Sequence, residues 1–286
     1  MWSRLITKLV ESSSMDRKAG HSKKSIRWYT HCMSDDMPRR TVAGGIAIIV
    51  DVLRASTTIV TALEAGAAFV KPVVEVDEAR RLRTTSGGSC LLGGEREGLR
   101  VTGFDLGNSP AEYCRSTVEG RGIVMTTTNG TLAIERCLAA EAVLVGSFLN
   151  RSSVAKEAVL LASNRDVDAI HLVCAGTNGH ETEEDFLGAG AIIHAGVSES
   201  GRNHLLDSRS EKALSDFLYV VNGSDEIQGQ LVESFRQSLG GRNLIELGMD
   251  SDLVLAAAID QCCLVPYLCP KTGHLVSFDA LQCIRK

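Results

Sequence analysis

Four carboxylates, Asp51, Glu95, Asp105 and Asp185, lie in stretches of the sequence where side chains can reach a ligand. Asp51 directly follows a short apolar run, and Glu95 and Asp105 lie in a glycine-rich, charged segment. Asp185 lies near the expected start of a helix. Carboxylate oxygens of this kind are the ligands that Mg²⁺ prefers in proteins. The four residues are therefore the candidate metal ligands, and Asp51 could alternatively act as a nucleophile.

Each of these residues also has a purely structural explanation. Asp51 could form an ion pair with Arg54 that only shapes the loop, although Arg54 could equally clamp a phosphate or sulfonate through two hydrogen bonds. Glu95 and Asp105 could belong to a solvated surface loop, since residues 93–110 have few apolar anchors. Asp185 could favour the positive end of a helix dipole. The residue types alone leave both readings open.

An anion-binding loop is predicted at residues 126–131, which read Thr-Thr-Thr-Asn-Gly-Thr between an expected strand and an expected helix. Small hydroxyl side chains and glycine let the backbone approach a ligand closely. The unpaired N–H groups at a helix N-terminus suit a phosphate or a sulfonate. The alternative is ordinary capping of the helix by threonine or asparagine.

Three well-known phosphate chemistries are excluded by their missing signatures. The 126–131 loop lacks the Walker pattern GxxxxGK[ST]. The haloacid dehalogenase signature DxDx[TV] fails because position 53 is Leu. A phosphocysteine mechanism at Cys174 requires arginine six residues on, where this chain has His180.

The elements that must position these residues alternate along the chain. Short continuous apolar runs predict strands, and apolar residues at helical spacing between them predict helices. The runs at 45–50 and 122–125 are followed directly by Asp51 and Thr126, and the run at 169–174 has Cys174 as its last residue. Strands buried on both faces and alternating with helices predict a three-layer α/β/α fold with a mainly parallel or mixed sheet. Because ligands bind beyond the carboxyl ends of such strands, the three loops are expected to converge. Residues 207–262 are expected to be mostly helical.

Composition narrows the function classes. The net charge is −5, but residues 1–40 hold nine Lys/Arg against four Asp/Glu, so the remainder is strongly acidic. An acidic body with 5% aromatic residues is a poor nucleic-acid binder. No apolar stretch approaches the ~20 residues that span a bilayer. The nine cysteines are odd in number and lack zinc spacing, which indicates reduced thiols and a cytoplasmic protein. We expect residues 1–25 to be a disordered tail and residues 26–286 to be one domain.

Four segments, in this order, resemble the 2-phosphosulfolactate phosphatases of coenzyme M biosynthesis. The resemblance runs from about residue 40 almost to the C-terminus. Its most specific parts are Phe104 to Pro110 and Thr126 to Thr131. The segments read VDVLRA at 50–55, GGER at 93–96 with GFDLGNSP at 103–110, TTTNGT at 126–131, and CAGT at 174–177 with Glu184-Asp185.

This resemblance implies a Mg²⁺-dependent phosphatase that converts 2-phosphosulfolactate to sulfolactate and phosphate. By the same resemblance the catalytic residues would be Asp51, Arg54, Glu95 and Asp105, and Mg²⁺ would be held by some of Asp51, Glu95, Asp105 and Asp185. It also suggests a homo-oligomer. The residues expected to bind the small anionic substrate are Arg96, Asn108, Thr127, Thr128, Asn129, Gly130, Thr131, Gly176 and Thr177.

Two alternatives stay open. The first is a phosphatase of the same fold that acts on another phosphorylated 2-hydroxy acid, such as a phospholactate or a phosphoglycerate. The second is a non-catalytic protein that binds small dianions. Carboxylates at positions 51, 95, 105 and 185 argue against the second.

Overall fold

The computed structural model of the chain describes residues 25–32, 37–177, 179–199, 202–222 and 226–278. Except for Ser25, the predicted tail lies outside the described residues. Within them, no helix has both the length and the apolar character needed to cross a membrane. The cysteines in this part of the chain are all free thiols.

The described strands form one sheet, in the order β5-β4-β6-β3-β11-β10-β7-β2-β8-β1-β9. Neighbours from β9 to β7 are parallel, and so are β3, β6 and β4. An antiparallel hairpin, β10 and β11, lies between these two parallel groups. The strands are β1 (Ile26–Cys32), β2 (Ile46–Val50), β3 (Phe69–Pro72), β4 (Leu91–Arg96), β5 (Leu99–Arg100), β6 (Gly122–Thr126), β7 (Ala142–Gly146), β8 (Ala169–Cys174), β9 (His204–Leu206), β10 (Pro266–Cys269) and β11 (His274–Ser277).

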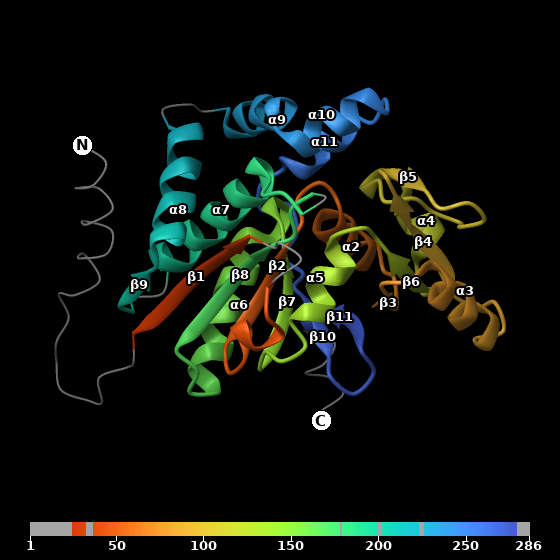
Figure 1. Ribbon diagram of the computed structural model, residues 1–286, viewed down its shortest axis with the longest axis horizontal. Coiled ribbons are helices and arrows are strands. Elements are labelled where there is room, and N and C mark those ends of the chain that lie inside the picture. Colours follow the sequence, from red (N-terminus) through yellow and green to blue (C-terminus); the bar gives the residue numbers. More distant parts are fainter. Residues whose placement is uncertain (1–24, 33–36, 178, 200–201, 223–225, 279–286) are drawn as a thin grey trace.

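Helices cover both faces of the larger parallel group, because alternate residues of its strands point to opposite cores. In β2, Ile46, Ile48 and Val50 join one core, while Ala47 and Ile49 join the other. The first core is covered by α6 (Arg151–Asn164), α7 (Glu183–Glu199) and α8 (Ser208–Val220). The second is covered by α2 (Ala55–Glu64) and α5 (Gly130–Arg136) (Figure 1). The prediction of a three-layer α/β/α fold with a mainly parallel sheet is confirmed.

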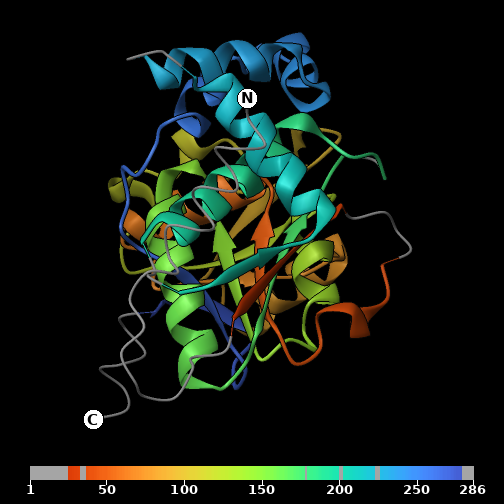
Figure 2. The ribbon, with the colours of Figure 1, turned by 90° about the vertical axis from the view of Figure 1, so that its left-hand side faces the viewer.

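Two smaller groups of helices complete the molecule. Helix α3 (Val76–Thr85) packs on one face of β4 and β6, and Val118 of the short α4 (Arg115–Val118) joins the core on the other face. Helices α9 (Ile227–Gln237), α10 (Leu239–Glu246) and α11 (Ser251–Ala256) lie beyond the end of the sheet to which the strand arrows point (Figure 2). With α8, they confirm the predicted helical region at 207–262.

The glycine-rich segment 93–110 differs from its prediction as a long loop, because it begins in β4 and turns back through β5. Two glycines hid this strand, since glycine weakens a strand pattern. Both are required by close packing against neighbours. A Cβ at Gly94, where φ is +141°, would lie 1.9 Å from the carbonyl oxygen of Thr126, and one at Gly93 would lie 2.3 Å from the Tyr113 hydroxyl oxygen.

Candidate active site

The carboxyl ends of β2, β4 and β6 and the loop after β8 meet around one cavity of about 550 Å³. The expected convergence of these loops is therefore present in the structure. Eight of the residues predicted from sequence line the cavity. They are Asp51, Arg54, Glu95, Arg96, Asn108, Thr128, Asn129 and Thr177.

Asp51 lies at the base of the cavity with only 7% of its surface exposed. Its Oδ1 accepts the N–H of Ala55, the first residue of α2, at 3.0 Å. The pKa of Asp51 is raised to about 7, chiefly by burial and also by the charges of Glu95 and Glu184, against the bond from Ala55 and the charge of Arg54. The free protein therefore carries a carboxyl group here that titrates near neutral pH.

Glu95 faces the same cavity and takes the donors expected for an anion. Its Oε1 accepts the N–H of Thr128 at 2.8 Å. Its Oε2 accepts the N–H of Gly98 at 2.9 Å and the hydroxyl of Thr128 at 3.2 Å. The backbone N–H of Thr128 thus donates to the carboxylate of Glu95. The sequence predicts that this N–H binds a phosphate, so the prediction is wrong for Thr128.

The rest of the 126–131 loop supports the site from behind. The N–H of Thr131 donates to Thr127 Oγ1 at 3.1 Å, and the Thr131 hydroxyl donates to the Thr127 carbonyl at 2.9 Å. These two buried side chains therefore close the turn and do not line the cavity. Gly130 permits a close approach, because a Cβ there would lie 2.6 Å from Asp51 Oδ2.

The two arginines of the cavity differ in their partners. Arg54 forms a buried ion pair with Asp252 at 2.9 Å and donates to the Gly98 carbonyl at 2.7 Å. It does not pair with Asp51 as the structural alternative supposed. Arg96 bonds to the carbonyls of Glu95 and Val74 and to the Thr126 hydroxyl. Within the described residues no carboxylate pairs with Arg96, so its positive charge remains available to an anion.

Asp105 and Asp185 do not line the cavity. Asp105 Oδ2 accepts from Arg83 at 2.7 Å and from the N–H of Leu92 at 2.8 Å. This pairing holds it away from the site, so the structure does not bring Asp105 together with the other predicted catalytic residues. Asp185 lies beneath the cavity, fully buried, and its burial raises its pKa well above the usual range.

The two oxygens of Asp185 tie the end of β2 to the loop after β8. Oδ1 accepts the N–H of Val52 at 2.7 Å, and Oδ2 accepts the N–H of Gly176 at 2.9 Å. Gly176 has a φ of +69° and belongs to the support of the site rather than to its lining. Asp185 and Gly176 therefore hold Thr177 and the loop after β2 in place.

Several residues of the site were not predicted as functional. Helix α10 supplies Gly240, Asn243, Leu244 and Glu246 to the cavity wall. Behind them lies Glu184, which the family resemblance includes beside Asp185; it is 1% exposed, and its Oε2 has no hydrogen-bond partner among the described residues. A Cβ at Gly240 would lie 2.0 Å from Glu184 Oε1. The glycine pair at 240–241 is the sequence feature that could have indicated a close approach in this helix. The sequence does not indicate that the group approaching it is Glu184.

Acidic groups outnumber basic ones around the cavity. Asp51, Glu95, Glu97 and Glu246 line it, against Arg54 and Arg96, and Arg54 is already paired. In the described part of the chain, no three His, Cys, Asp or Glu side chains lie close enough to hold a metal by themselves. Mg²⁺ commonly binds one or two carboxylates and fills its other positions with water and substrate phosphate. Asp51 and Glu95 fit that kind of site, whereas the four-carboxylate set is not assembled.

The sequence match decides the family. Residues 32–271 match the family model described as 2-phosphosulpholactate phosphatase. The chain belongs to this family. The resemblance read from the four segments is confirmed, and the chain is a phosphoric monoester hydrolase, as predicted.

Curated relatives in the 2-phosphosulfolactate phosphatase family cover most of the chain. A "Probable 2-phosphosulfolactate phosphatase" of Clostridium acetobutylicum is 36% identical over 233 residues, which is 82% of this chain and 93% of the relative. A protein of the same name from Thermotoga petrophila is 42% identical over 222 residues, 78% of this chain and 88% of the relative. One from Symbiobacterium thermophilum is 36% identical over 230 residues, with 80% and 93% covered. The region matched by the family model, residues 32–271, includes every residue that lines the cavity.

Proposed function

We propose that this phosphatase hydrolyses 2-phosphosulfolactate to sulfolactate and phosphate, with Mg²⁺ as its cofactor. The observation that carries the proposal is that one cavity brings together two carboxylates and an arginine that has no carboxylate partner in the described part of the chain. Arg96 offers a positive charge to an anionic ester, and Asp51 and Glu95 offer oxygens to a cation. The names of the relatives supply the substrate. We further propose a cytoplasmic enzyme of coenzyme M biosynthesis.

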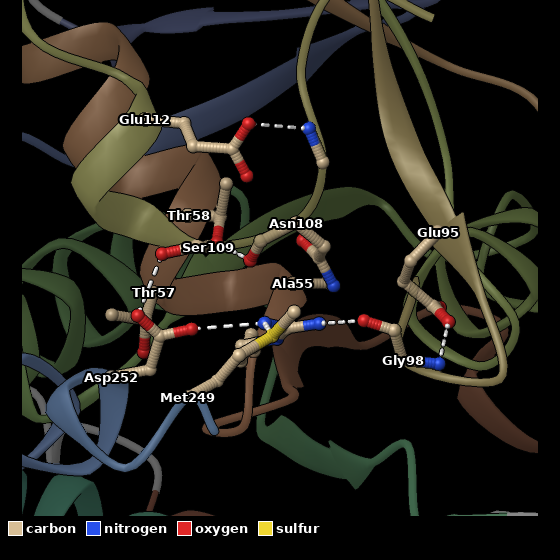
Figure 3. Close-up of polar contacts among 12 residues, drawn as sticks. Ala55, Thr57, Thr58, Glu95, Gly98, Asn108, Ser109, Glu112, Met249 and Asp252 are labelled. Carbon is tan, nitrogen blue, oxygen red and sulfur yellow. Dashed lines mark hydrogen bonds and ion pairs between the residues drawn. The ribbon is translucent and has the colours of Figure 1, made fainter. Parts of the chain in front are cut away.

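In the proposed reaction the chain positions a highly charged substrate. Arg96 binds an anionic group of the ester. The carboxamide of Asn108 is buried and lines the cavity, and its Oδ1, without a partner among the described residues, can accept a hydrogen bond from a water there. Figure 3 shows Asn108 turned toward the side of the cavity where Glu95 lies. Water attacks phosphorus, and the bond to the ester oxygen breaks to give the hydroxyl of sulfolactate and free phosphate.

Asp51 and Glu95 are the residues that would hold Mg²⁺. The ion, when bound, supplies neutralisation of the charge on the phosphate oxygens. It would also offset the burial of Asp51 and the negative charge of Glu95, both of which raise the pKa of Asp51. This explains why an anion-binding enzyme has an acidic cavity.

The direct test is phosphate release from racemic 2-phosphosulfolactate, with and without Mg²⁺, beside phospholactate and an aryl phosphate. We expect release that depends on Mg²⁺ and strongly favours phosphosulfolactate. Release from the other esters alone would keep the phosphatase and reject this substrate. Release that is unchanged by exhaustive chelation would reject the metal. No release from any ester would favour the dianion-binding alternative.

Stability should depend on pH and Mg²⁺ together. Because the pKa of Asp51 is raised in the folded protein, the fold retains a proton that the unfolded chain loses between about pH 4 and pH 7. The free energy of unfolding should therefore fall as the pH rises through that window. Mg²⁺ favours the ionised carboxylates, so it should raise Tm by about 5 °C or more at pH 8 and by little at pH 5. Thermal unfolding from pH 5 to 8 measures both effects.

The matched control for this experiment is Asp51→Asn, which removes the titrating group. The difference in Tm between wild type and variant should change with pH, and the Mg²⁺ shift should largely disappear. An equal Mg²⁺ shift at pH 5 and pH 8, or one that survives in Asp51→Asn, would contradict the assignment.

A further inference from the structure

Asp252, on the short helix α11, contacts residues at the cavity wall from a distant part of the chain. Its side chain is 2% exposed, and each of its oxygens has a separate partner. Oδ2 pairs with the Arg54 guanidinium at 2.9 Å, and Oδ1 accepts the hydroxyl of Ser109 at 2.6 Å. A single buried carboxylate thus joins the loop after β2 to the loop that follows β5 (Figure 3).

Both partners of Asp252 belong to the wall of the cavity or adjoin it. Arg54 lines the cavity directly. Ser109 follows Asn108, which also lines the cavity and whose carbonyl accepts the Thr58 hydroxyl at 2.7 Å. Figure 3 shows the two neighbours turned apart, Asn108 toward the side of Glu95 and Ser109 toward Asp252. Holding Ser109 therefore also orients Asn108.

The remaining contacts of Arg54 leave Asp252 as its charge partner. One nitrogen donates to the Gly98 carbonyl at 2.7 Å, and the other contacts Met249 Sδ at 2.9 Å besides Asp252. The Arg54 side chain is 3% exposed. A buried guanidinium without its carboxylate keeps its charge but loses one of the bonds that fix its direction, the one to a charged partner.

We propose that Asp252 is a positioning residue of the phosphatase reaction, which sets the Arg54 guanidinium and the Asn108 carboxamide at the substrate. It acts through these two residues and does not touch the substrate itself. Because it also neutralises Arg54, it keeps that arginine from binding the anionic substrate too tightly before reaction. Orientation raises turnover, whereas neutralisation weakens ground-state binding, so the two effects separate in kcat and KM.

The variant Asp252→Asn tests this proposal, because it preserves shape and removes charge. We expect kcat to fall about 100-fold, while KM stays unchanged or decreases because Arg54 is no longer neutralised. The matched control is Asp260→Asn, which breaks the ion pair between Arg151 and Asp260 away from the cavity. The control should lower Tm without altering kcat or KM of the folded enzyme.

A second variant keeps the test decisive if Asp252→Asn does not fold. Ser109→Ala leaves the Arg54 ion pair intact and removes only the bond that orients the Asn108 segment. We expect kcat to fall about 5-fold with Tm within a few degrees of wild type. Wild-type kcat and KM in folded Asp252→Asn, or in Ser109→Ala if Asp252→Asn does not fold, would overturn the proposal. A lower Tm with unaltered kinetics would show a purely structural ion pair.

Discussion

Asp51→Asn is expected to lower kcat about 10²- to 10³-fold, the size of loss seen when one preorganised charge-stabilising group is removed. Asparagine can still accept the N–H of Ala55, so the loop should keep its shape. It cannot supply a negative oxygen to Mg²⁺. Steady-state phosphate release at saturating Mg²⁺ measures the effect.

The Asp51→Asn variant should have a higher Tm than the wild type although it has lost activity. The ionised form of Asp51 is disfavoured by burial, which is why its pKa rises to about 7. Replacing it by a neutral amide should therefore raise Tm above pH 7 when Mg²⁺ is absent. Near-normal turnover in a folded Asp51→Asn protein would remove Asp51 from the mechanism.

Glu95→Gln is expected to lower kcat/KM about 100-fold or more and also to lower Tm. Both oxygens of Glu95 accept donors, from Gly98 and twice from Thr128. Glutamine would turn an NH₂ group toward one of these backbone N–H groups, leaving a buried donor unsatisfied at a cost of about 1–3 kcal/mol. Kinetics together with thermal unfolding separate this variant from Asp51→Asn, since their Tm changes should have opposite signs.

Asp105→Asn provides the comparison for Glu95→Gln, since sequence grouped the two acids and the structure separates them. Asp105 bonds to Arg83 and to the backbone of Leu92, outside the cavity. We expect it to retain turnover within about 3-fold of wild type, with some loss of Tm. A loss as large as that of Glu95→Gln would return Asp105 to the catalytic set.

The strand-and-helix skeleton could be predicted because its signals are local. A continuous apolar run such as 46–50 must be buried on both faces, and Asp51 must then fall at the carboxyl edge of a parallel sheet. The same reasoning places residues 174–177 beside it, because β8 runs parallel to β2. The convergence of Asp51 and Thr177 on one cavity follows from the parallel pairing of β2 and β8. Thr128 follows β6, in the smaller group, which the hairpin reverses relative to β2, so its arrival at the same cavity depends on the folded shape of the sheet.

The rest could not be predicted, because it depends on contacts between distant segments. Nothing in the local sequence of Asp252 indicates that it reaches Arg54. The glycines of β4 weaken the strand pattern in the sequence. They are needed because β6 and its neighbours pack too closely against β4 to leave room for a side chain. Asp105 and Glu95 have similar surroundings in sequence, and only the folded chain reveals that one faces Arg83 and the other the cavity.

The antiparallel hairpin at the centre of the sheet has a consequence for how the enzyme is made. Strand β10 pairs with β7, and β11 pairs with β3, at Tyr267 with Leu144 and Leu275 with Val70. The group that includes β7 carries Asp51, while the group that includes β3 carries Glu95. On the ribosome both groups emerge before the hairpin, and pairings this far apart along the chain form slowly. The strands that carry the two acids therefore join into one sheet only after β10 and β11 have been synthesised. A nascent chain that lacks these strands should have no phosphatase activity.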